Sequence, residues 1–326
     1  MTAPHDPDAG QGSPGRRRAF PGPRGWTRIA LAVLVLLLVA VGADVALLAD
    51  RVDEVAVDLD ADDSDGQTWV LVGLDSREHL PAGASVAEYG SAEDVPGTRA
   101  DIILVVHVDG DRTSVLSVPR DLMLRTDRVV PERLAVTWQR GPQVTVDALC
   151  GLGIPTDHLV TVDLAGFAAI VDSVGGLDLD VARPVRDPAA GLQIDRAGPQ
   201  NVDGRTALAL VRSRHTEHLV DGAWVPAPAE PEGRSAAVRT TLTALAGAVH
   251  GLGTQPWRLQ GVAWTVSGAL TTDVGTSPVE LASLAGVDPS ATSTLPADSR
   301  DGAVPIAWPT RETGRALRAA GLSCER

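Results

Sequence analysis

The chain contains no lysine, few aromatic residues and an excess of acidic side chains. Aromatic residues make up 3% of its 326 residues, so valine, leucine, alanine and isoleucine must fill most of the core, for which the hydrophobic content of 44% is sufficient. The formal net charge is −14, and every basic side chain is an arginine. Such a chain has no basic field to collect phosphates, which excludes a general nucleic-acid-binding protein. Local clusters of arginine are therefore informative.

Cysteine is scarce as well, with two residues in the whole chain, Cys150 and Cys324. No C-x-x-C pair occurs and the seven histidines are scattered, so no zinc-binding spacing is present. One disulfide would suit an exported protein. The alternative is two unpaired buried thiols, and the sequence leaves both open.

One long apolar run lies near the N-terminus, over residues 29–49, with Asp44 as its single charge. A membrane-spanning helix needs about 20 apolar residues, and the arginines before the run predict a cytoplasmic N-terminus. We therefore predict a basic cytoplasmic tail over residues 1–28 and a transmembrane anchor over residues 29–49. A cleaved signal peptide is the alternative, with "VGA" before Asp44 as its cleavage site. Both place most of the chain outside the cytoplasm.

An acidic stretch, residues 50–67, follows the apolar run. Dense charge of one sign is more typical of a solvated, self-repelling spacer than of a metal site. We therefore predict an extracytoplasmic stalk over residues 50–67 and a folded extracytoplasmic domain over residues 68–326.

Signals for strands and helices alternate through this domain without internal repeats, which predicts an α/β layered fold with a mixed sheet. The pattern predicts a strand at 68–73, a helix that ends at Gly151, a helix at 163–174 capped by Asp163, a strand at 177–181 and a helix at 233–253. A short helix from Asp203 is predicted to continue into an extended segment, "VRSRH". In an extended segment side chains alternate, so Arg212 and Arg214 would point the same way.

Residues 97–121, "GTRADIILVVHVDGDRTSVLSVPRD", contain two apolar runs around an Asp-Gly pair, which predicts a β-hairpin. The open end of this hairpin gathers four charged residues: Arg99, Asp101, Arg120 and Asp121. A loop of residues 109–112 would set Asp101 opposite Arg120, whereas a turn of Asp109-Gly110 alone would shift the register. Both registers bring the four charges to one edge of the sheet.

Two other segments end in similar charges. The strand at 68–73 leads to Asp75 and Arg77, and the "VRSRH" segment carries Arg212 and Arg214, with Arg234 at the start of a later helix. Ion pairs at strand ends would explain any one of these groups, but three of them in an acidic chain favour a shared site. Arginine forks bind phosphate, and carboxylates among them tolerate phosphate when a divalent cation, usually Mg²⁺, lies between. The residues therefore indicate a metal-bound pyrophosphate.

Five stretches follow one another in the order and spacing of a known family's motifs. They are "VGLDSR" (72–77), "RADIILVVHVD" (99–109), "VLSVPRD" (115–121), "DHLVTVDLAGFAAIVDSVGGLDLDV" (157–181) and "VDGRTALALVRSRH" (202–215). Together they resemble the LytR-CpsA-Psr family over about residues 68–250, and "ALTTDVGTSPVELASLAG" resembles its actinobacterial members. The resemblance implies an α/β fold with a mixed central β-sheet flanked by helices in α-β-α order, and an N-terminal transmembrane helix.

The resemblance also implies an activity. The implied activity is that of a Mg²⁺-dependent phosphotransferase, which moves a glycopolymer from a polyprenyl-pyrophosphate carrier to peptidoglycan during cell-wall assembly. The implied location is the cell membrane, which the chain would cross once, with the catalytic domain outside the cytoplasm. A non-catalytic envelope protein that binds lipid-linked polymers is one alternative. A prenyl-pyrophosphate phosphatase, in which water replaces the acceptor, is another.

Roles for individual residues follow from the same resemblance. Asp75 and Asp101 match the metal-binding aspartates, while Asp121 would orient Arg120 or act as a base; these four form the predicted catalytic set. The residues that match arginines around the lipid pyrophosphate are Arg99, Arg120, Arg212, Arg214 and Arg234. After Arg234 the sequence departs from the family, because Ala237 and Val238 replace a basic residue and a glutamine. One set of phosphate-side donors is therefore missing, and a working but altered enzyme is favoured over an inactive relative.

Overall fold

The computed structural model describes residues 23–59, 66–91, 93, 96–228, 233–300 and 305–324. Met1–Ala46 and Leu47–Arg326 form separate compact units. Helix α1, most of which belongs to the first unit, runs over Pro23–Ala49, so the apolar segment predicted at 29–49 is helical. No helix within the described residues combines the length and the hydropathy that crossing a membrane requires. The predicted tail, residues 1–28, lies outside the described residues up to residue 22.

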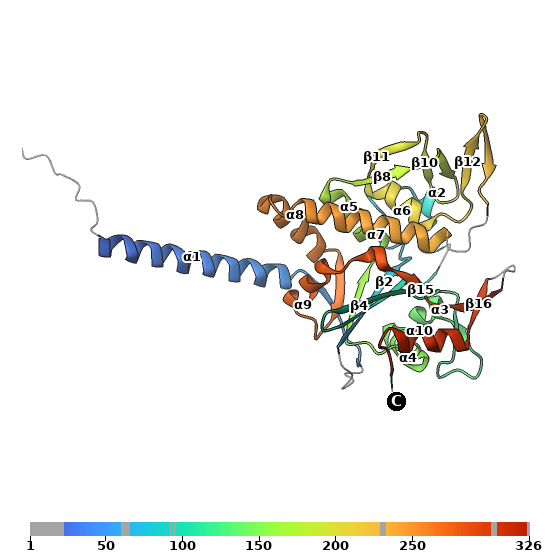
Figure 1. Ribbon diagram of the computed structural model, residues 1–326, viewed down its shortest axis with the longest axis horizontal. Helices are drawn as coiled ribbons and strands as arrows, with labels where there is room; N and C mark the ends of the chain where they lie inside the picture. Colours follow the sequence, from blue (N-terminus) through green and yellow to red (C-terminus); the bar gives the residue numbers. More distant parts are fainter. Residues whose placement is uncertain are drawn as a thin grey trace, which may run out of the picture. The chain divides into compact units, whose positions relative to one another are not determined.

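A seven-stranded mixed sheet forms the centre of the second unit (Figure 1). Its strands, in spatial order, are β1 (Asp53–Val55), β14 (Leu270–Asp273), β7 (His158–Val162), β2 (Gln67–Leu74), β3 (Ala100–Asp109), β4 (Arg112–Ser117) and β15 (Ser293–Thr294). The pairs β1–β14, β2–β7 and β4–β15 are parallel and the others are antiparallel. The prediction of an α/β fold with a mixed sheet is confirmed.

Helices cover both faces of this sheet. The remaining helices are α2 (Val86–Tyr89), α3 (Leu134–Thr137), α4 (Pro142–Leu152), α5 (Leu164–Val174), α6 (Gly204–Arg212), α7 (Gly233–Gly251), α8 (Pro256–Ser267), α9 (Pro278–Ser283) and α10 (Arg311–Ala319), with 3₁₀ turns at Trp138–Arg140, Leu284–Gly286 and Pro289–Ala291. The view in Figure 1 shows α3, α4 and α10 on one side of the sheet and α5, α6 and α7 on the other.

Small sheets complete the unit. They pair β5 (Met123–Leu124) with β6 (Glu132–Arg133), β8 (Leu177–Val181) with β11 (Gly198–Val202), and β16 (Ala297–Arg300) with β17 (Ile306–Pro309). A four-stranded sheet has the order β10 (Leu192–Ile194), β9 (Val185–Asp187), β12 (Glu217–Val220) and β13 (Ala223–Pro226).

The alternation of side chains along β2 explains why both sheet faces are apolar. Val70 and Val72 belong to the cluster that contains Leu149 of α4 and Leu317 of α10. Trp69 points to the opposite face, where it packs with residues of β3, β4 and β7 and with the segment that follows α9. Successive residues of a strand face opposite sides, so a strand buried on both faces reads as a continuous apolar run. The run "TWVLV" is such a strand.

The predicted hairpin is present, and its register is the one with the longer loop. Val108 pairs with Thr113 and Asp109 with Arg112 across β3 and β4. The helix at 163–174 and the strand at 177–181 are also confirmed, as α5 and β8. The side chain of Asp163 accepts a hydrogen bond from the Gly166 amide at 2.7 Å, which is the predicted N-terminal cap.

The extended segment predicted at "VRSRH" is wrong. Helix α6 continues to Arg212, because Asp203 caps its start by accepting a hydrogen bond from the Thr206 amide at 2.8 Å and its apolar face is buried. Ser213 ends the helix, and the next strand, β12, begins only at Glu217. Arg212 and Arg214 therefore do not share a strand face: one leaves a helix end and the other a turn.

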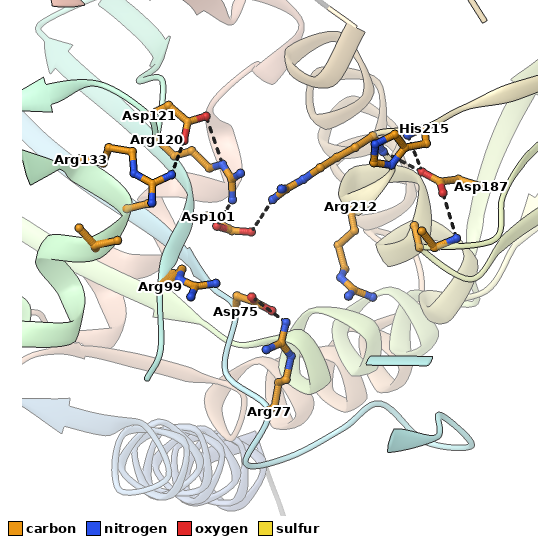
Figure 2. A pocket seen from close by; sticks show the side chains of 15 residues that line it. Asp75, Arg77, Arg99, Asp101, Arg120, Asp121, Arg133, Asp187, Arg212 and His215 are labelled. Atoms are coloured by element: carbon orange, nitrogen blue, oxygen red, sulfur yellow. Dashed lines mark hydrogen bonds and ion pairs between the residues drawn. The ribbon is translucent and has the colours of Figure 1, made fainter. Parts of the chain in front are cut away.

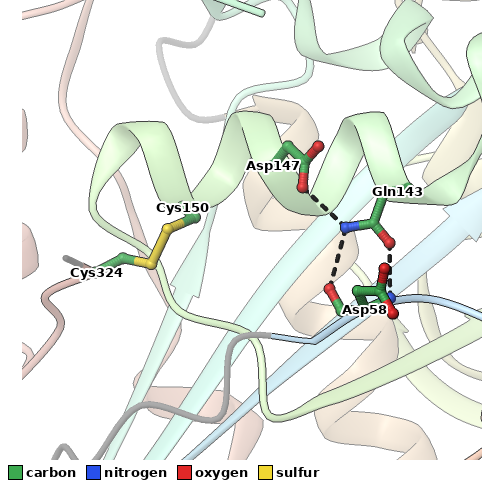
Figure 3. Close-up of a disulfide and its surroundings, with 5 residues drawn as sticks. All are labelled: Asp58, Gln143, Asp147, Cys150 and Cys324. Atoms are coloured by element: carbon green, nitrogen blue, oxygen red, sulfur yellow. Dashed lines mark hydrogen bonds between the residues drawn. A yellow bond between two sulfur atoms is a disulfide. The ribbon is translucent and has the colours of Figure 1, made fainter. Parts of the chain in front are cut away.

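The stalk predicted over residues 50–67 also differs from the structure. Residues 53–55 form an edge strand of the central sheet, and Val57 and Leu59 pack against the main core. The side chain of Gln143 in α4 holds the backbone of Asp58, accepting from its amide at 2.7 Å and donating to its carbonyl at 3.0 Å (Figure 3). The apolar residues that alternate with the acidic ones bind this segment to the domain. Residues 60–65 lie outside the described residues.

The two cysteines form a disulfide, which decides between the two alternatives left open by the sequence. Cys150 lies in α4, and Cys324, near the C-terminus, meets it across 174 residues of sequence (Figure 3). The bond ties the C-terminal segment after α10 to the helix that covers one sheet face.

We expect replacement of Cys150 and Cys324 by serine to lower the free energy of unfolding by about 2–5 kcal/mol, because the crosslink restricts the unfolded chain across a long loop. Thermal unfolding of the wild type and of the double variant, each with and without reductant, measures this. The wild type should respond to reductant and the variant should not. Equal melting temperatures in oxidising buffer would contradict the expectation.

Candidate active site

A cavity of about 410 Å³ opens at the edge of the sheet where β2 and β4 end and β3 begins (Figure 2). The charged residues that line it are Asp75, Arg77, Arg99, Asp101, Arg120, Asp121, Arg133, Asp187, Arg212, Arg214 and His215. Six arginines face four aspartates here, although the whole chain has a net charge of −14. The cavity is therefore a cationic site on an acidic protein.

The predicted site residues whose side chains the structure describes are all brought together. Asp75, Arg99, Asp101, Arg120, Asp121, Arg212 and Arg214 all line the cavity. The side chain of Arg234 lies outside the described residues. Val238, one turn further along α7, is buried and packs with Leu104 and Val211. This position therefore contributes to the apolar core rather than to the polar site.

Asp101 lies at the centre of the site and joins two parts of the chain. Its Oδ1 accepts a close hydrogen bond from Nη1 of Arg120, the residue that the hairpin register sets opposite it. Its Oδ2 accepts from Nη2 of Arg214 at 3.5 Å. Asp121 lies on the far side of Arg120, with its Oδ2 3.5 Å from Nε of that arginine and its Oδ1 3.6 Å from Nη1 of Arg133. The result is a chain of alternating charges.

Asp75 occupies the loop after β2. Its Oδ2 accepts a hydrogen bond from Nη2 of Arg77 at 3.1 Å, and 11% of its side chain is exposed. Burial raises the pKa of Asp75 and the charge of Asp101 raises it further, although Arg77, Arg212 and Arg99 oppose the shift. Two carboxylates thus repel each other inside a largely desolvated pocket.

Arg77 and Arg212 have buried nitrogen donors that make no hydrogen bond within the described residues. Within the described residues, Nε and Nη1 of Arg77 and Nη1 of Arg212 are buried without a hydrogen-bond partner. The guanidinium carbon of Arg212 lies 4.3 Å from the ring centroid of Tyr89, the one tyrosine of the chain, so a cation–π contact orients it. Leaving buried donors unpaired is costly, so these groups are suited to an anionic ligand.

Asp187 also lines the cavity, and the sequence did not reveal its place there. It is 1% exposed, and its Oδ2 accepts hydrogen bonds from the Ser213 hydroxyl and from the amides of Arg214 and His215, each at 2.8 Å. Burial by itself would raise the pKa of Asp187, but these hydrogen bonds outweigh it and the pKa is lowered. Asp187 therefore fixes the turn that carries Arg214. No local pattern signals this role, because its partners lie more than 20 residues away.

The donor set of the cavity is compatible with Mg²⁺. Figure 2 shows Asp75 and Asp101 facing the same space between the arginines. Magnesium is commonly held by one or two carboxylates together with phosphate oxygens and water. No group of three or more histidine, cysteine or acidic side chains suited to a metal occurs among the described residues. Two aspartates would thus hold the ion only with a phosphate or water completing its shell.

The pattern of the LytR_cpsA_psr family matches residues 40–285. The chain belongs to this family. It is 35% identical over 218 residues to the probable cell wall biosynthesis protein LcpB of Corynebacterium glutamicum. The aligned region covers 64% of this chain and 51% of the relative. It is 30% identical over 180 residues to the polyisoprenyl-teichoic acid–peptidoglycan teichoic acid transferase TagU of Halalkalibacterium halodurans, covering 53% of each.

Solved structures agree with this assignment. The LytR-Csp2A-Psr enzyme from Actinomyces oris superimposes with a TM-score of 0.68 at 36% identity, over 84% of this chain and 97% of that one. The structure of TagV from B. subtilis has a TM-score of 0.56 at 19% identity, covering 79% and 97%, and shows the shared fold. The chain spans about half the length of the curated relatives it matches. The predicted family is confirmed.

We expect Asp187→Ala to loosen the turn at 213–215 and to lower the free energy of unfolding by about 1–3 kcal/mol, because three donors lose a buried acceptor. Hydrogen exchange of the amides of Arg214 and His215 should become faster. Asp195→Ala, at an exposed position after β10, is the control and should leave both amides unchanged. Unaltered exchange in Asp187→Ala would show that the turn is held by other contacts.

A second expectation concerns pH. The pKa of Asp75 is raised above 3.8, so the native state binds this proton more tightly than the unfolded state, and ionisation at neutral pH costs stability. Without metal, Asp75→Asn should therefore melt at a higher temperature than the wild type at pH 7. The difference should shrink as the pH falls through the raised pKa towards 3.8.

Thermal unfolding in a chelator across this pH range measures the effect. The exposed Asp180→Asn is the control and should show no pH-dependent gain. A pH-independent difference for Asp75→Asn would mean that the carboxylate is not destabilised by burial and by Asp101.

Proposed function

We propose that the protein is a Mg²⁺-dependent phosphotransferase that moves a glycopolymer from a polyprenyl-pyrophosphate carrier to peptidoglycan during cell-wall assembly. The observation that carries the proposal is the cavity in which six arginines surround Asp75 and Asp101. Bidentate guanidinium groups suit the oxygens of a diphosphate, and two carboxylates among them suit a bridging cation. A binding protein would need the arginines but not the pair of desolvated carboxylates.

The printed names of relatives support the classes of donor and acceptor. TagU is named for the transfer of teichoic acid from a polyisoprenyl carrier to peptidoglycan. The relative from C. glutamicum, LcpB, is named for cell wall biosynthesis. Family membership, together with these names, favours a transferase over a phosphatase for this chain.

The arginines would bind the diphosphate by exchanging their present partners. Arg214 shares Asp101 with Arg120, and its side chain is 48% exposed, so it can turn to a phosphate at little cost. The unpaired donors of Arg77 and Arg212 are available without any rearrangement. Asp187 holds the turn of Arg214 in place during this exchange.

Asp75 and Asp101 are the residues that would hold Mg²⁺. When bound, the ion would neutralise charge on the diphosphate and ease departure of the leaving phosphate. The acceptor hydroxyl attacks the sugar-linked phosphorus, a new oxygen–phosphorus bond forms, and the bond to polyprenyl phosphate breaks. Asp121 would take the hydroxyl proton, because Asp75 and Asp101 would hold the metal and Asp187 is engaged by backbone amides. Asp121 is ion-paired to Arg120 and Arg133 at 3.5 and 3.6 Å, but its Oδ1 accepts no hydrogen bond within the described residues.

Helix α1 is the proposed anchor, with residues 29–49 in the membrane, the basic tail inside and the domain outside. Its described side chains support this, since Leu36, Leu38, Val39 and Val41 are each more than 60% exposed and apolar. Water would not favour such a surface on a free helix.

We expect Asp101→Asn and Arg214→Ala each to lower the transfer rate by about 100- to 1,000-fold, as removal of charge stabilisation in a transition state does. The full chain in detergent is incubated with Mg²⁺, a lipid-pyrophosphate glycan and a peptidoglycan acceptor. Arg315→Ala, at an exposed position in α10, is the matched control and should retain full activity. Chelation of Mg²⁺ should abolish turnover, and its addition should restore it.

The products separate the alternatives. Glycan on the acceptor, with release of polyprenyl phosphate, supports transfer. Free glycan phosphate without acceptor product would indicate a phosphatase, and retention of lipid without turnover would indicate a binding protein. Unchanged turnover in Asp101→Asn and Arg214→Ala would show that the site lies elsewhere.

A further inference from the structure

Helix α8 exposes two tryptophans on one face. Trp257 is 72% exposed and Trp264 is 48% exposed. They are seven residues apart, which places them two turns along the same side of the helix. Gly261, between them, is exposed, and a Cβ there would meet nothing within 4 Å. Helix α8 contains no acidic residue. In a chain with 3% aromatic residues, two large exposed rings on one helix face without acidic residues form a surface suited to an apolar or interfacial partner.

This face adjoins the point where the chain leaves the domain towards α1. Arg51 follows the end of α1 by two residues, and its guanidinium carbon lies 3.8 Å from the centroid of the Trp264 ring. Its Nη2 donates to the Trp264 carbonyl at 3.3 Å and its Nε donates to the Ser267 hydroxyl at 3.4 Å. Three contacts thus hold Arg51, near the start of the domain, against the Trp264 end of α8.

The strand register places the cavity at the same edge of the sheet. Asp53 begins β1 beside Thr271, and Leu270 pairs with Val162. Val162 pairs with Gly73, after which β2 delivers Asp75 to the cavity. The chain exit and the catalytic edge are therefore separated only laterally, by three strand spacings or roughly 14 Å.

Tryptophan is enriched at membrane–water interfaces, because its ring is apolar and its N–H group can hydrogen-bond. We propose that the exposed face of α8, centred on Trp257 and Trp264, contacts the lipid interface and turns the cavity edge towards the headgroups. The proposal rests on the anchoring by α1 proposed above. If α1 already holds the domain at the membrane, α8 needs only a weak affinity for lipid, because the anchor keeps its effective concentration at the bilayer high.

The test uses the full chain reconstituted into vesicles of phosphatidylcholine and phosphatidylglycerol. Gly261→Cys is labelled with a thiol-specific nitroxide, which the native cysteines do not react with because they form the disulfide. Collision of the label with oxygen, which concentrates in lipid, and with a water-soluble nickel chelate reports its environment. Arg315→Cys, on the exposed side of α10, is the control in water.

We expect the nickel collision rate at residue 261 to be several-fold lower than at residue 315, and the oxygen rate to be higher. Adding Trp257→Ser, which alters a side chain outside the catalytic cavity, should shift residue 261 towards the values of residue 315. Equal nickel access at both labels, or no shift on Trp257→Ser, would overturn the contact.

An alkaline wash separates this outcome from failure of the anchor. If the wash extracts the chain, anchoring by α1 is wrong and the contact of α8 falls with it. If the chain stays with the vesicles while residue 261 remains in water, only the α8 contact is overturned, and the proposed transfer activity stands.

Discussion

The rest of the site depends on the two ion pairs that the carboxylate of Asp101 forms with Arg120 and Arg214. One oxygen accepts from Arg120 and the other from Arg214, residues that lie 19 and 113 positions further along the chain. The cavity therefore exists only when the hairpin and the turn after α6 are both in place. Asp187 supports the second partner from behind, by holding the backbone of Arg214. Binding of a diphosphate would replace ion pairs that already exist, so the arginines are held in position beforehand and little ordering is needed.

The sequence predicted those parts of the site that are determined by residues close together in the chain. The hairpin and the gathering of its four end charges at one edge follow from an Asp-Gly pair between apolar runs. The sequence left two registers open, and the structure selects the one that sets Asp101 opposite Arg120. The end of α6 was not predictable in this way, because burial of its apolar face extends the helix through Arg212. Residues 53–59 read as a spacer by charge, yet Val55, Val57 and Leu59 pack into the core. Asp187 acts entirely through distant partners, which a single sequence does not display.

Stability and function are in tension at Asp75. Burial and the neighbouring Asp101 both raise its pKa, so the charged form that a metal requires is the form that the fold disfavours. If these residues served only the stability of the fold, a neutral side chain in place of Asp75 or Asp101 would remove the repulsion between the two carboxylates. A cation and a phosphate, bound as proposed above, would together compensate for this repulsion, and perturbed pKa values are typical of functional sites.

The absence of lysine has a consequence for the cavity. Every fixed cation that lines it is a guanidinium, which stays protonated far above neutral pH even where burial lowers the pKa of Arg214. No amine is present there to be acetylated, carbamylated or converted to a Schiff base. The capacity of the pocket for anions is therefore insensitive both to alkaline surroundings and to the reagents that modify amines. A domain outside the cytoplasm, as proposed above for this chain, would therefore keep its ligand-binding charge without cytoplasmic buffering.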